Sequence, residues 1–265
     1  MPCENNNNTM SFDLNVNNIS LLLMSIAPMV LNSKSFYTIK EKPNRLSLNQ
    51  SRTDVQTINC YDFNNSGGTR LRSTDYIPDL RQHDFDNKIG SCCMTGIWIL
   101  YAEDEYNSYD TGAANWWAYG DNFCADMPVQ FDNQASSLRF TGAPDDWNYD
   151  TLNIYFNNYF TGDEKFTYED NPQLNYNDRA KSLIVTGCTP WTLYDGDHFT
   201  GESMCVFPNS ASECTPGFYP MERALGSLAG RVSSAKKGCH ARLKVLPVNH
   251  NEETATSGSS QLYRA

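Results

Sequence analysis

Four short polar segments recur along the chain and carry the side chains best suited to chemistry. They read DNKIGS at 86–91, DNQASS at 132–137, NDRAKS at 177–182 and a degenerate LAGRVSS at 228–234. Their last serines are spaced by 46, 45 and 52 residues, and a glycine follows each within five residues. The oxygen atoms of Asn, Asp and Ser suit a bound cation, but the same side chains also bond to local backbone and end strands without any metal.

The charge balance narrows the classes of partner. Lys and Arg number 20 and Asp and Glu 31, which leaves a formal net charge of −11 over 265 residues. This balance disfavours nucleic acid and anionic membranes as partners, and it suits either solubility alone or the binding of cations. Apolar residues make up 40% of the chain and aromatic residues 12%, which is enough for folded cores and too much for a disordered chain.

Each polar segment closes a repeat that opens with a short alternating strand ending in tyrosine. These openings lie at 58–61, 97–101, 152–155 and 191–194. One spacing of aromatic residues and glycine occurs in both the third and the fourth repeat: Tyr155, Phe160 and Gly162, then Tyr194, Phe199 and Gly201. A hairpin that folds back over its own sheet needs a positive φ angle where no Cβ fits, which selects glycine, and an aromatic ring covers the bend.

The elements that must position these residues are strands. Short alternating runs, frequent turn residues and the lack of an amphipathic helix predict an all-β antiparallel protein. A repeat of about 45 residues holds about four strands, so two repeats predict one two-sheet sandwich. A four-bladed propeller has a similar repeat length but would be very small. A connector rich in Pro and Asp at 143–146 separates two predicted domains, at 56–142 and 148–246.

This arrangement resembles the βγ-crystallin superfamily. The Greek key motif of that family carries an aromatic and glycine hairpin, followed later by two Asn or Asp residues, two variable residues, Ser or Thr, and Ser. The resemblance covers most of 56–240 and implies two βγ-crystallin-like Greek key β-sandwich domains. The polar segment is intact at 132–137, and the hairpin is intact in the third and fourth repeats. In the first repeat Ser66 replaces the second aromatic residue, and in the second Ser108 replaces the glycine.

For members of the family that bind calcium, the resemblance implies that paired polar segments exchange ligands. Side chains and a carbonyl group from one loop meet a hydroxyl group from the other. Oxygen ligands of this kind make weak Ca²⁺ sites of the extracellular type. Three ligand sets follow for this chain: Asp86, Asn87 and the Lys88 carbonyl with Ser136; Asp132, Asn133 and the Gln134 carbonyl; and Asn177, Asp178 and the Arg179 carbonyl with Ser233.

The three sets are unequal. The first and the third each include a hydroxyl group, whereas the second meets Gly90 where a hydroxyl group is needed and is expected to be weaker. A fourth set would place the Lys181 ammonium group beside the ion, opposite Ala229 and Gly230, and like charges repel. We therefore expect at most one serviceable site in each domain. A purely structural role for all four loops stays open.

Eight of the nine cysteines divide evenly between the two predicted domains, and the ninth, Cys3, precedes them. Even counts favour disulfides in an exported protein over unpaired core cysteines, and no paired spacing typical of zinc occurs. Adjacent Cys92 and Cys93 are expected to point to opposite faces of a strand. For the second domain we consider two pairings, Cys205 with Cys214 and Cys188 with Cys239. The disulfide candidates are Cys60, Cys92, Cys93, Cys124, Cys188, Cys205, Cys214 and Cys239.

The ends of the chain bear on its location. Residues 1–35 form a possible signal segment, because the apolar run at 19–31 is too short to span a bilayer but suits a signal-peptide core. No Lys or Arg precedes that run, which argues against a standard signal peptide. We expect a secreted protein without a membrane span. Residues 36–55 are predicted to be a flexible arm and residues 249–265 a disordered tail.

The remaining residues favour a binding or structural protein over an enzyme. The four histidines have no catalytic or metal spacing, and no phosphate loop or nucleophile elbow occurs. We expect a non-enzymatic protein, structural or weakly calcium-binding. The alternative is a protein-interaction module of the proteinase-inhibitor, antimicrobial or toxin-like kind, which would contact a protein or carbohydrate through an aromatic loop at 106–126. Burial of those rings at a core edge or domain interface is the favoured interpretation.

Overall fold

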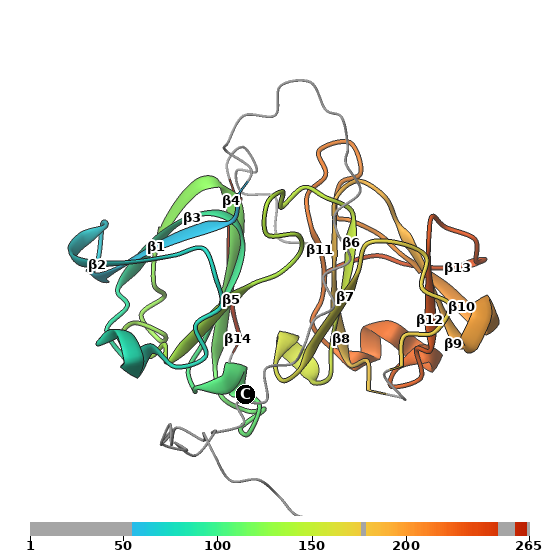
Figure 1. Ribbon diagram of the computed structural model, residues 1–265, viewed down its shortest axis with the longest axis horizontal. Coiled ribbons are helices and arrows are strands. Elements are labelled where there is room, and N and C mark those ends of the chain that lie inside the picture. The colour runs from blue at the N-terminus through green and yellow to red at the C-terminus, as the bar shows by residue number, and fades with distance from the viewer. Residues whose placement is uncertain (1–54, 176–178, 249–257, 264–265) are drawn as a thin grey trace, which may run out of the picture. The chain divides into compact units, whose positions relative to one another are not determined.

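The computed structural model describes residues 55–175, 179–248 and 258–263, and it is built from antiparallel strands with short 3₁₀ helices (Figure 1). The predicted leader at 1–35 and nearly all of the predicted arm at 36–55 lie outside the described residues. The strands are β1 (Thr57–Phe63), β2 (Gly67–Ser73), β3 (Ser91–Tyr101), β4 (Asn115–Asp126), β5 (Ser137–Phe140), β6 (Thr151–Tyr155), β7 (Glu164–Thr167), β8 (Ser182–Thr186), β9 (Trp191–Gly196), β10 (Thr200–Val206), β11 (Gly217–Tyr219), β12 (Ser234–Lys237), β13 (Leu243–Val245) and β14 (Gly258–Tyr263). The 3₁₀ helices are η2 (Leu80–His83), η3 (Glu105–Asn107), η4 (Asn158–Phe160), η5 (Asp197–Phe199) and η6 (Glu222–Leu228).

The first sandwich is organised by the long hairpin of β3 and β4, which passes from one layer to the other. The first half of β3 pairs with β1, which pairs with β2, whereas its second half pairs with β5. The register of β3 and β4 shifts between Met94 and Gly96, and Gly96 has a φ angle of 108°. Strands change sheets at such irregularities, so one hairpin contributes to both layers.

The second sandwich has two separate four-stranded sheets, ordered β11-β8-β6-β7 and β12-β9-β10-β13. Each repeat gives one segment to the sheet of the other. Strand β11 of the fourth repeat pairs with β8 of the third, and Asn171 of the third repeat bridges Ala235 on β12 of the fourth. A similar bridge joins Ile77 to Leu138 in the first sandwich. This exchange makes two repeats one folding unit and confirms the predicted Greek key sandwiches.

Each sandwich encloses its own apolar core. In the first, Trp98, Trp116 and Phe131 are fully buried among aliphatic side chains, and in the second Trp191 and Tyr219 take the same role. The alternation predicted from the sequence is the cause, because residues two apart on a strand face the same side.

One serine in each repeat holds the hairpin folded over the sheet, and its hydroxyl group makes the same two hydrogen bonds every time. The hydroxyl group donates to the carbonyl two residues after the opening tyrosine and accepts from the amide five residues after it. The bonds are Ser91 with Phe63 and Ser66, Ser137 with Glu103 and Tyr106, Ser182 with Asn157 and Phe160, and Ser234 with Gly196 and Phe199. All four serines are buried. The repeated spacing in the sequence therefore has a direct structural cause.

The same hairpins contain the positive φ angles that the glycine spacing predicts. Gly162 and Gly201 have φ angles of 74° and 83°. A Cβ atom on Gly201 would lie 2.1 Å from a carboxylate oxygen of Asp195, so this close approach leaves room only for glycine. Ser108, at the equivalent place in the second repeat, has a φ angle of −65°. That hairpin is held in another way, by the buried amide of Asn107, which donates to the carbonyls of Ala113 and Ala114.

Four disulfides staple the sandwiches, two in each. They join Cys60 to Cys92, Cys93 to Cys124, Cys188 to Cys214 and Cys205 to Cys239. Cys92 is buried and Cys93 half-buried, as expected for adjacent residues on opposite faces of a strand. The two pairings considered for the second domain, Cys205 with Cys214 and Cys188 with Cys239, are wrong. Cys205 lies on β10 beside the segment that enters the parallel strand β13, and this places Cys239 within its reach.

The segment predicted as a long aromatic loop at 106–126 is largely strand β4. Trp116, Trp117 and Tyr119 are buried on it, and only Tyr109 is strongly exposed among the aromatic residues of this segment. The favoured interpretation, burial of the rings at a core edge or interface, is confirmed for Trp116, Trp117 and Tyr119, and the alternative of an exposed aromatic contact surface there is wrong. The disordered tail predicted at 249–265 is wrong for Gly258–Tyr263, which forms β14 at the edge of β4.

The two sandwiches meet in an aromatic cluster that includes Trp117, Tyr119, Phe160 and Phe218. Beside it lies Arg139 of β5, a buried cation whose Nε donates to the hydroxyl group of Tyr101 at 2.9 Å. Its two terminal nitrogens donate across the interface to the carbonyls of Phe160 and Gly162 at 2.8 and 3.0 Å. These three bonds fix the orientation of the Arg139 side chain, because a guanidinium group bonds in one plane.

Buried Glu164 of β7 supplies the opposite charge. Its carboxylate accepts from the hydroxyl groups of Tyr155 at 2.6 Å, Tyr76 at 2.8 Å and Thr141 at 3.1 Å. Burial, and then the negative charge of Glu164, raise the pKa of Tyr155 well above its ordinary value. Tyr155 therefore stays neutral and remains a hydrogen-bond donor at all physiological pH values.

Replacing the buried serine of one repeat tests the hairpin bonds. Ser137→Ala leaves the carbonyl of Glu103 and the amide of Tyr106 without their partner, so we expect a loss of about 1 to 3 kcal/mol in the free energy of unfolding. Urea unfolding in calcium-free buffer measures it. The matched control is Ser136→Ala in the same loop, whose amide, not its hydroxyl group, bonds to the carbonyl of Tyr101. Equal losses in the two variants would contradict the assignment.

A double-mutant cycle tests the charged pair at the interface. Arg139→Met and Glu164→Gln each leave a buried charge without its counterpart, and each is expected to destabilise the protein by about 3 to 5 kcal/mol. The double variant should lose less than the sum of the two, by about 1 kcal/mol or more, because neither charge then remains. Additive losses in urea unfolding would show that the two groups act independently.

Candidate calcium-binding loops

The first two polar segments lie face to face in the first sandwich. The amide of Asn87 donates to the carbonyl of Ala135 at 2.9 Å, and the amide of Asn133 donates to the carbonyl of Ile89 at 3.0 Å. Asn87 and Asn133 have φ angles of 53° and 55°, a left-handed conformation that Asn tolerates better than most residues. The structure therefore brings together the two loops that the sequence pairs, in a reciprocal arrangement.

Each of these loops holds one buried carboxylate oxygen that has no hydrogen-bond partner. These atoms are Oδ1 of Asp86 and Oδ1 of Asp132, the first residues of the two segments. The other oxygen of Asp86 accepts from the side-chain amide of Asn87 at 3.1 Å. A buried polar atom without a partner is uncommon and costs free energy, so each needs an explanation. An oxygen-seeking cation is one, since carboxylate oxygens are preferred ligands of Ca²⁺.

The first ligand set, Asp86, Asn87 and the Lys88 carbonyl with Ser136, is compatible with this geometry. The Lys88 ammonium group donates to the carbonyl of Asp84 at 2.8 Å, so it is already engaged within its own loop. Ser136 is half-buried, and its amide donates to the carbonyl of Tyr101 at 2.8 Å, which fixes the backbone of the loop without the hydroxyl group. Ser137 uses its hydroxyl group to hold the hairpin, whereas the fold uses the backbone amide of Ser136, so the Ser136 hydroxyl group is a candidate ligand.

The second set, Asp132, Asn133 and the Gln134 carbonyl, faces Gly90. The amide of Gly90 donates to the carbonyl of Tyr61, and a Cβ atom on Gly90 would lie 3.0 Å from backbone atoms of both Asp62 and Phe63. The first hairpin therefore passes too close for a larger residue. Close packing of the hairpin backbone against residue 90 therefore explains why this set has a glycine where a hydroxyl group is needed.

The third set falls partly outside the described residues, since Asn177 and Asp178 are not among them. Arg179 is exposed, and its guanidinium group lies 5.5 Å from the centre of the Phe156 ring. Ser233 donates to the carbonyl of Arg231 at 3.4 Å. The amide of Gly230 donates to the carbonyl of Ala180, which repeats one of the two bonds that join the first pair of loops.

The fourth loop already holds a positive charge of its own. The guanidinium group of Arg231 forms ion pairs with Asp195 and, at 3.4 Å, with Glu202. Lys181 is half-buried on the facing loop. Together with the absence of side-chain oxygens at Ala229 and Gly230, this makes the fourth loop a poor cation site. No group of three or more His, Cys, Asp and Glu side chains with metal-site geometry occurs in the part of the chain that the structure describes.

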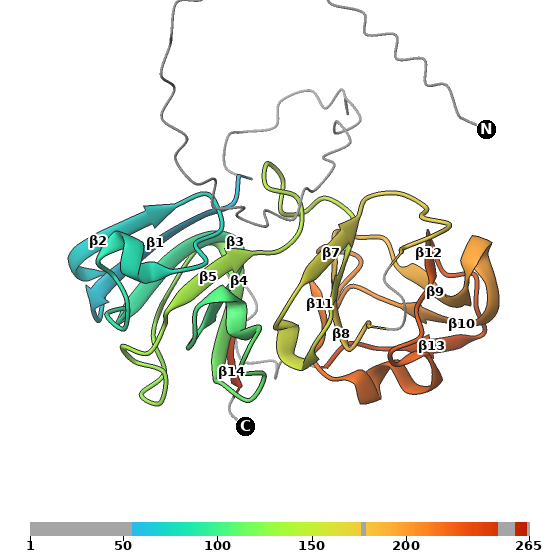
Figure 2. The same ribbon diagram turned by 60° about the horizontal axis from the view of Figure 1, so that its bottom comes forward.

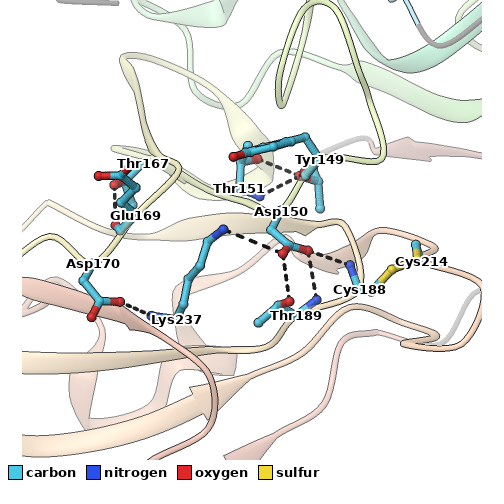
Figure 3. Close-up of polar contacts among 11 residues, drawn as sticks. Tyr149, Asp150, Thr151, Thr167, Glu169, Asp170, Cys188, Thr189, Cys214 and Lys237 are labelled. Carbon is cyan, nitrogen blue, oxygen red and sulfur yellow. Dashed lines mark hydrogen bonds and ion pairs between the residues drawn. A yellow bond between two sulfur atoms is a disulfide. The ribbon is translucent and has the colours of Figure 1, made fainter. Parts of the chain in front are cut away.

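A different polar cluster, around Asp150, was not predicted from the sequence (Figure 3). One carboxylate oxygen of Asp150 accepts from the amides of Cys188 and Thr189 at 2.9 and 3.1 Å, and the other accepts from the Thr189 hydroxyl group at 2.8 Å. The Lys237 ammonium group lies 3.7 Å away. The bonds of Asp150 anchor the strand connection next to the Cys188–Cys214 disulfide, so this cluster is structural.

Gly187 is the residue in the sequence that marks the position of the Asp150 cluster. Gly187 has a φ angle of 77°, and a Cβ atom there would lie 2.2 Å from a carboxylate oxygen of Asp150. Gln56 occupies the same position in the first sandwich, where it contacts Gly96 and accepts from the amide of Ile97. The sequence shows the glycines, but not which side chain lies against them.

The three described histidines, His83, His198 and His240, lie on different segments, and His83 is in η2. His198 is in the hairpin of the fourth repeat with a φ angle of 56°, and the Nε2 atom of His240 lies 2.8 Å from the carbonyl of Lys237. No helix among the described residues is both long and apolar enough to span a membrane.

Comparison with solved structures identifies the fold. Geodin, a βγ-crystallin from Geodia cydonium, superposes with a TM-score of 0.54 at 19% identity and covers 69% of this chain and 99% of its own. A βγ-crystallin from Ciona intestinalis matches at 26% identity over 33% of this chain and 98% of its own, with a TM-score of 0.28. Protein S complexed with calcium matches at 16% identity over 69% of this chain and 99% of its own, with a TM-score of 0.26.

The match to geodin is the one that identifies the fold. Of these three matches it alone exceeds a TM-score of 0.5, and it covers 69% of this chain. No family model matches the sequence, and no curated protein matches it. The hairpin serines, the exchanged strands and the paired polar loops agree with the structural match. The chain therefore has the βγ-crystallin fold, with four Greek key repeats in two sandwiches.

Proposed function

We propose that this chain is a non-enzymatic structural protein that binds Ca²⁺ weakly at the facing loops of its first sandwich. The observation that carries the proposal is the pair of buried, unpartnered oxygens on Asp86 and Asp132. They lie on two loops that are locked together by reciprocal backbone bonds. A cation bound at each loop would give each of these two oxygens a partner.

The stronger site uses Asp86, Asn87 and the Lys88 carbonyl with the hydroxyl group of Ser136. The reciprocal site uses Asp132, Asn133 and the Gln134 carbonyl and is weaker, because Gly90 offers no side-chain oxygen. Few charged ligands and a partly exposed position correspond to affinities of the extracellular kind, with Kd on the order of 10⁻⁴ to 10⁻³ M. We also propose that the two domains of the protein extend over residues 56–142 and 148–246.

We further propose that the protein works outside the cell. Four disulfides, two in each sandwich, support an oxidising compartment, because cytosolic thiols are kept reduced. Extracellular calcium is also abundant enough for a weak site to be filled. The possible signal segment at 1–35 fits the same location.

Calcium should stabilise the protein, and one hydroxyl group should matter for it. With Kd on the order of 10⁻³ M, 10 mM Ca²⁺ adds about 1.4 kcal/mol to the free energy of unfolding, so Tm should rise by roughly 3 to 6 °C and fall back when EGTA is added. Ser136→Ala and Asp86→Asn should remove most of that shift. Differential scanning calorimetry measures Tm, and calorimetric titration measures the binding itself.

The control for this experiment is Ser212→Ala, which removes an exposed hydroxyl group of the second sandwich. It should keep the full calcium response. No heat of binding and no rise in Tm for the unaltered protein would remove the metal from the proposal and leave the structural role. A response that survives both Ser136→Ala and Asp86→Asn would place the ion elsewhere.

A further inference from the structure

Strand β14 is an added strand at the edge of the first sandwich, although it follows the second sandwich in the sequence. Within the described part of the chain it pairs with β4 alone, in an unbroken antiparallel register from Gly258 opposite Gly120 to Tyr263 opposite Asn115. Both views of the molecule draw β14 beside β4 (Figures 1 and 2). The final strand of the chain therefore completes a sheet to which it has no direct covalent connection.

The half of β4 under β14 is apolar and carries no charged side chain. It reads NWWAYG at 115–120, and all six residues are buried. Without β14, this stretch would be a free edge with unpaired backbone amides and carbonyls. Natural sheets protect free edges with charges, prolines or a covering element, and an uncharged aromatic edge readily accepts another extended strand. This edge has the composition of a docking site for a strand.

Two side chains of β14 anchor it. Leu262 packs against the core of the first sandwich, and the ring of Tyr263 stacks on the ring of Tyr159 in η4 of the second. Asn115, opposite Tyr263, donates its side-chain amide to the carbonyl of Tyr159. The receiving site is thus built by both sandwiches before the strand enters, and any segment with the sequence of β14 would make the same contacts.

The connection to β14 is long enough for the strand to bind elsewhere. Nine residues, 249–257, separate it from Val248, and a fully extended chain of that length spans about 30 Å. These residues are polar apart from one alanine and include no proline. Among the described residues, the backbone pairing with β4 and the two anchors Leu262 and Tyr263 attach the strand to its docking site.

From this we infer that the β4 edge is a strand-docking site and that a second copy of the chain is the partner that fits it, by exchange of Gly258–Tyr263. A second copy supplies every register pair and both anchors without change, which makes strand exchange a route to dimers that needs no new interface. Protein concentration selects the state. A connection of nine residues holds the strand near its docking site at an effective concentration in the millimolar range, so exchange becomes measurable as the protein approaches that concentration.

Engineered cysteines at one register pair test the exchange in the full chain. Ser260 lies directly opposite Ala118, and the protein itself bridges directly opposed residues of neighbouring strands at Cys60–Cys92 and Cys93–Cys124. Ala118→Cys and Ser260→Cys are made in separate copies, mixed at about 1 mM and oxidised. We expect a covalent dimer at least tenfold more abundant than in either variant alone, measured by intact mass under non-reducing conditions.

Two controls fix the interpretation. Ser259→Cys replaces Ser260→Cys in the mixture as a one-residue register control, and its dimer yield should stay at background, because Ser259 lies opposite Tyr119. The double variant Ala118→Cys/Ser260→Cys, at micromolar concentration, should close within one chain. Closure of the double variant with no dimer in the mixture would overturn the exchange, and failure of both would overturn the strand pairing. Calcium plays no part in either readout.

Discussion

The buried serine hydroxyl group at the end of each repeat is the contact on which this fold depends. A hairpin that folds back over its own sheet exposes one carbonyl and one amide on its inner side, and a strand that follows some thirty residues later returns with the hydroxyl group that satisfies both. One side chain thus joins the start of a repeat to its end. Loss of either bond leaves a buried group without a partner, which costs more than the bond itself contributes.

This arrangement separates the structural serine from the proposed calcium ligand within one loop. Ser137 faces inward and bonds to the hairpin, whereas Ser136, its neighbour, uses only its amide for the fold. The first loop shows the limit of that freedom, because the close approach of the hairpin backbone at Gly90 leaves no room for a side chain. The fourth loop shows another limit, since Arg231 already fills it with charge. The side chains available for the proposed binding therefore differ among loops that share one backbone.

Local spacing predicted the repeats and the positive φ angles at Gly162 and Gly201, and the family resemblance implied the pairing of the loops at Asp86 and Asp132. Each of these depends on residues within one repeat or on its twin. The sequence did not predict the disulfide partners of Cys188 and Cys205, because pairing depends on which strands become neighbours after the chain has crossed between sheets. It also missed Arg139 and Glu164, whose charges meet only at the interface of the sandwiches, and β14, whose few apolar residues gain their burial from β4.

The unpartnered oxygens of Asp86 and Asp132 run against the rule that buried polar atoms find partners, and the first sandwich can carry them because its stability comes from elsewhere. Cys60–Cys92 and Cys93–Cys124 tie the three adjacent strands β1, β3 and β4, and β14 covers the exposed edge of the last. None of these supports involves the polar loops. A sandwich stabilised in this way can keep loops whose buried oxygens are unfavourable without a partner, and the proposed cation would remove that cost.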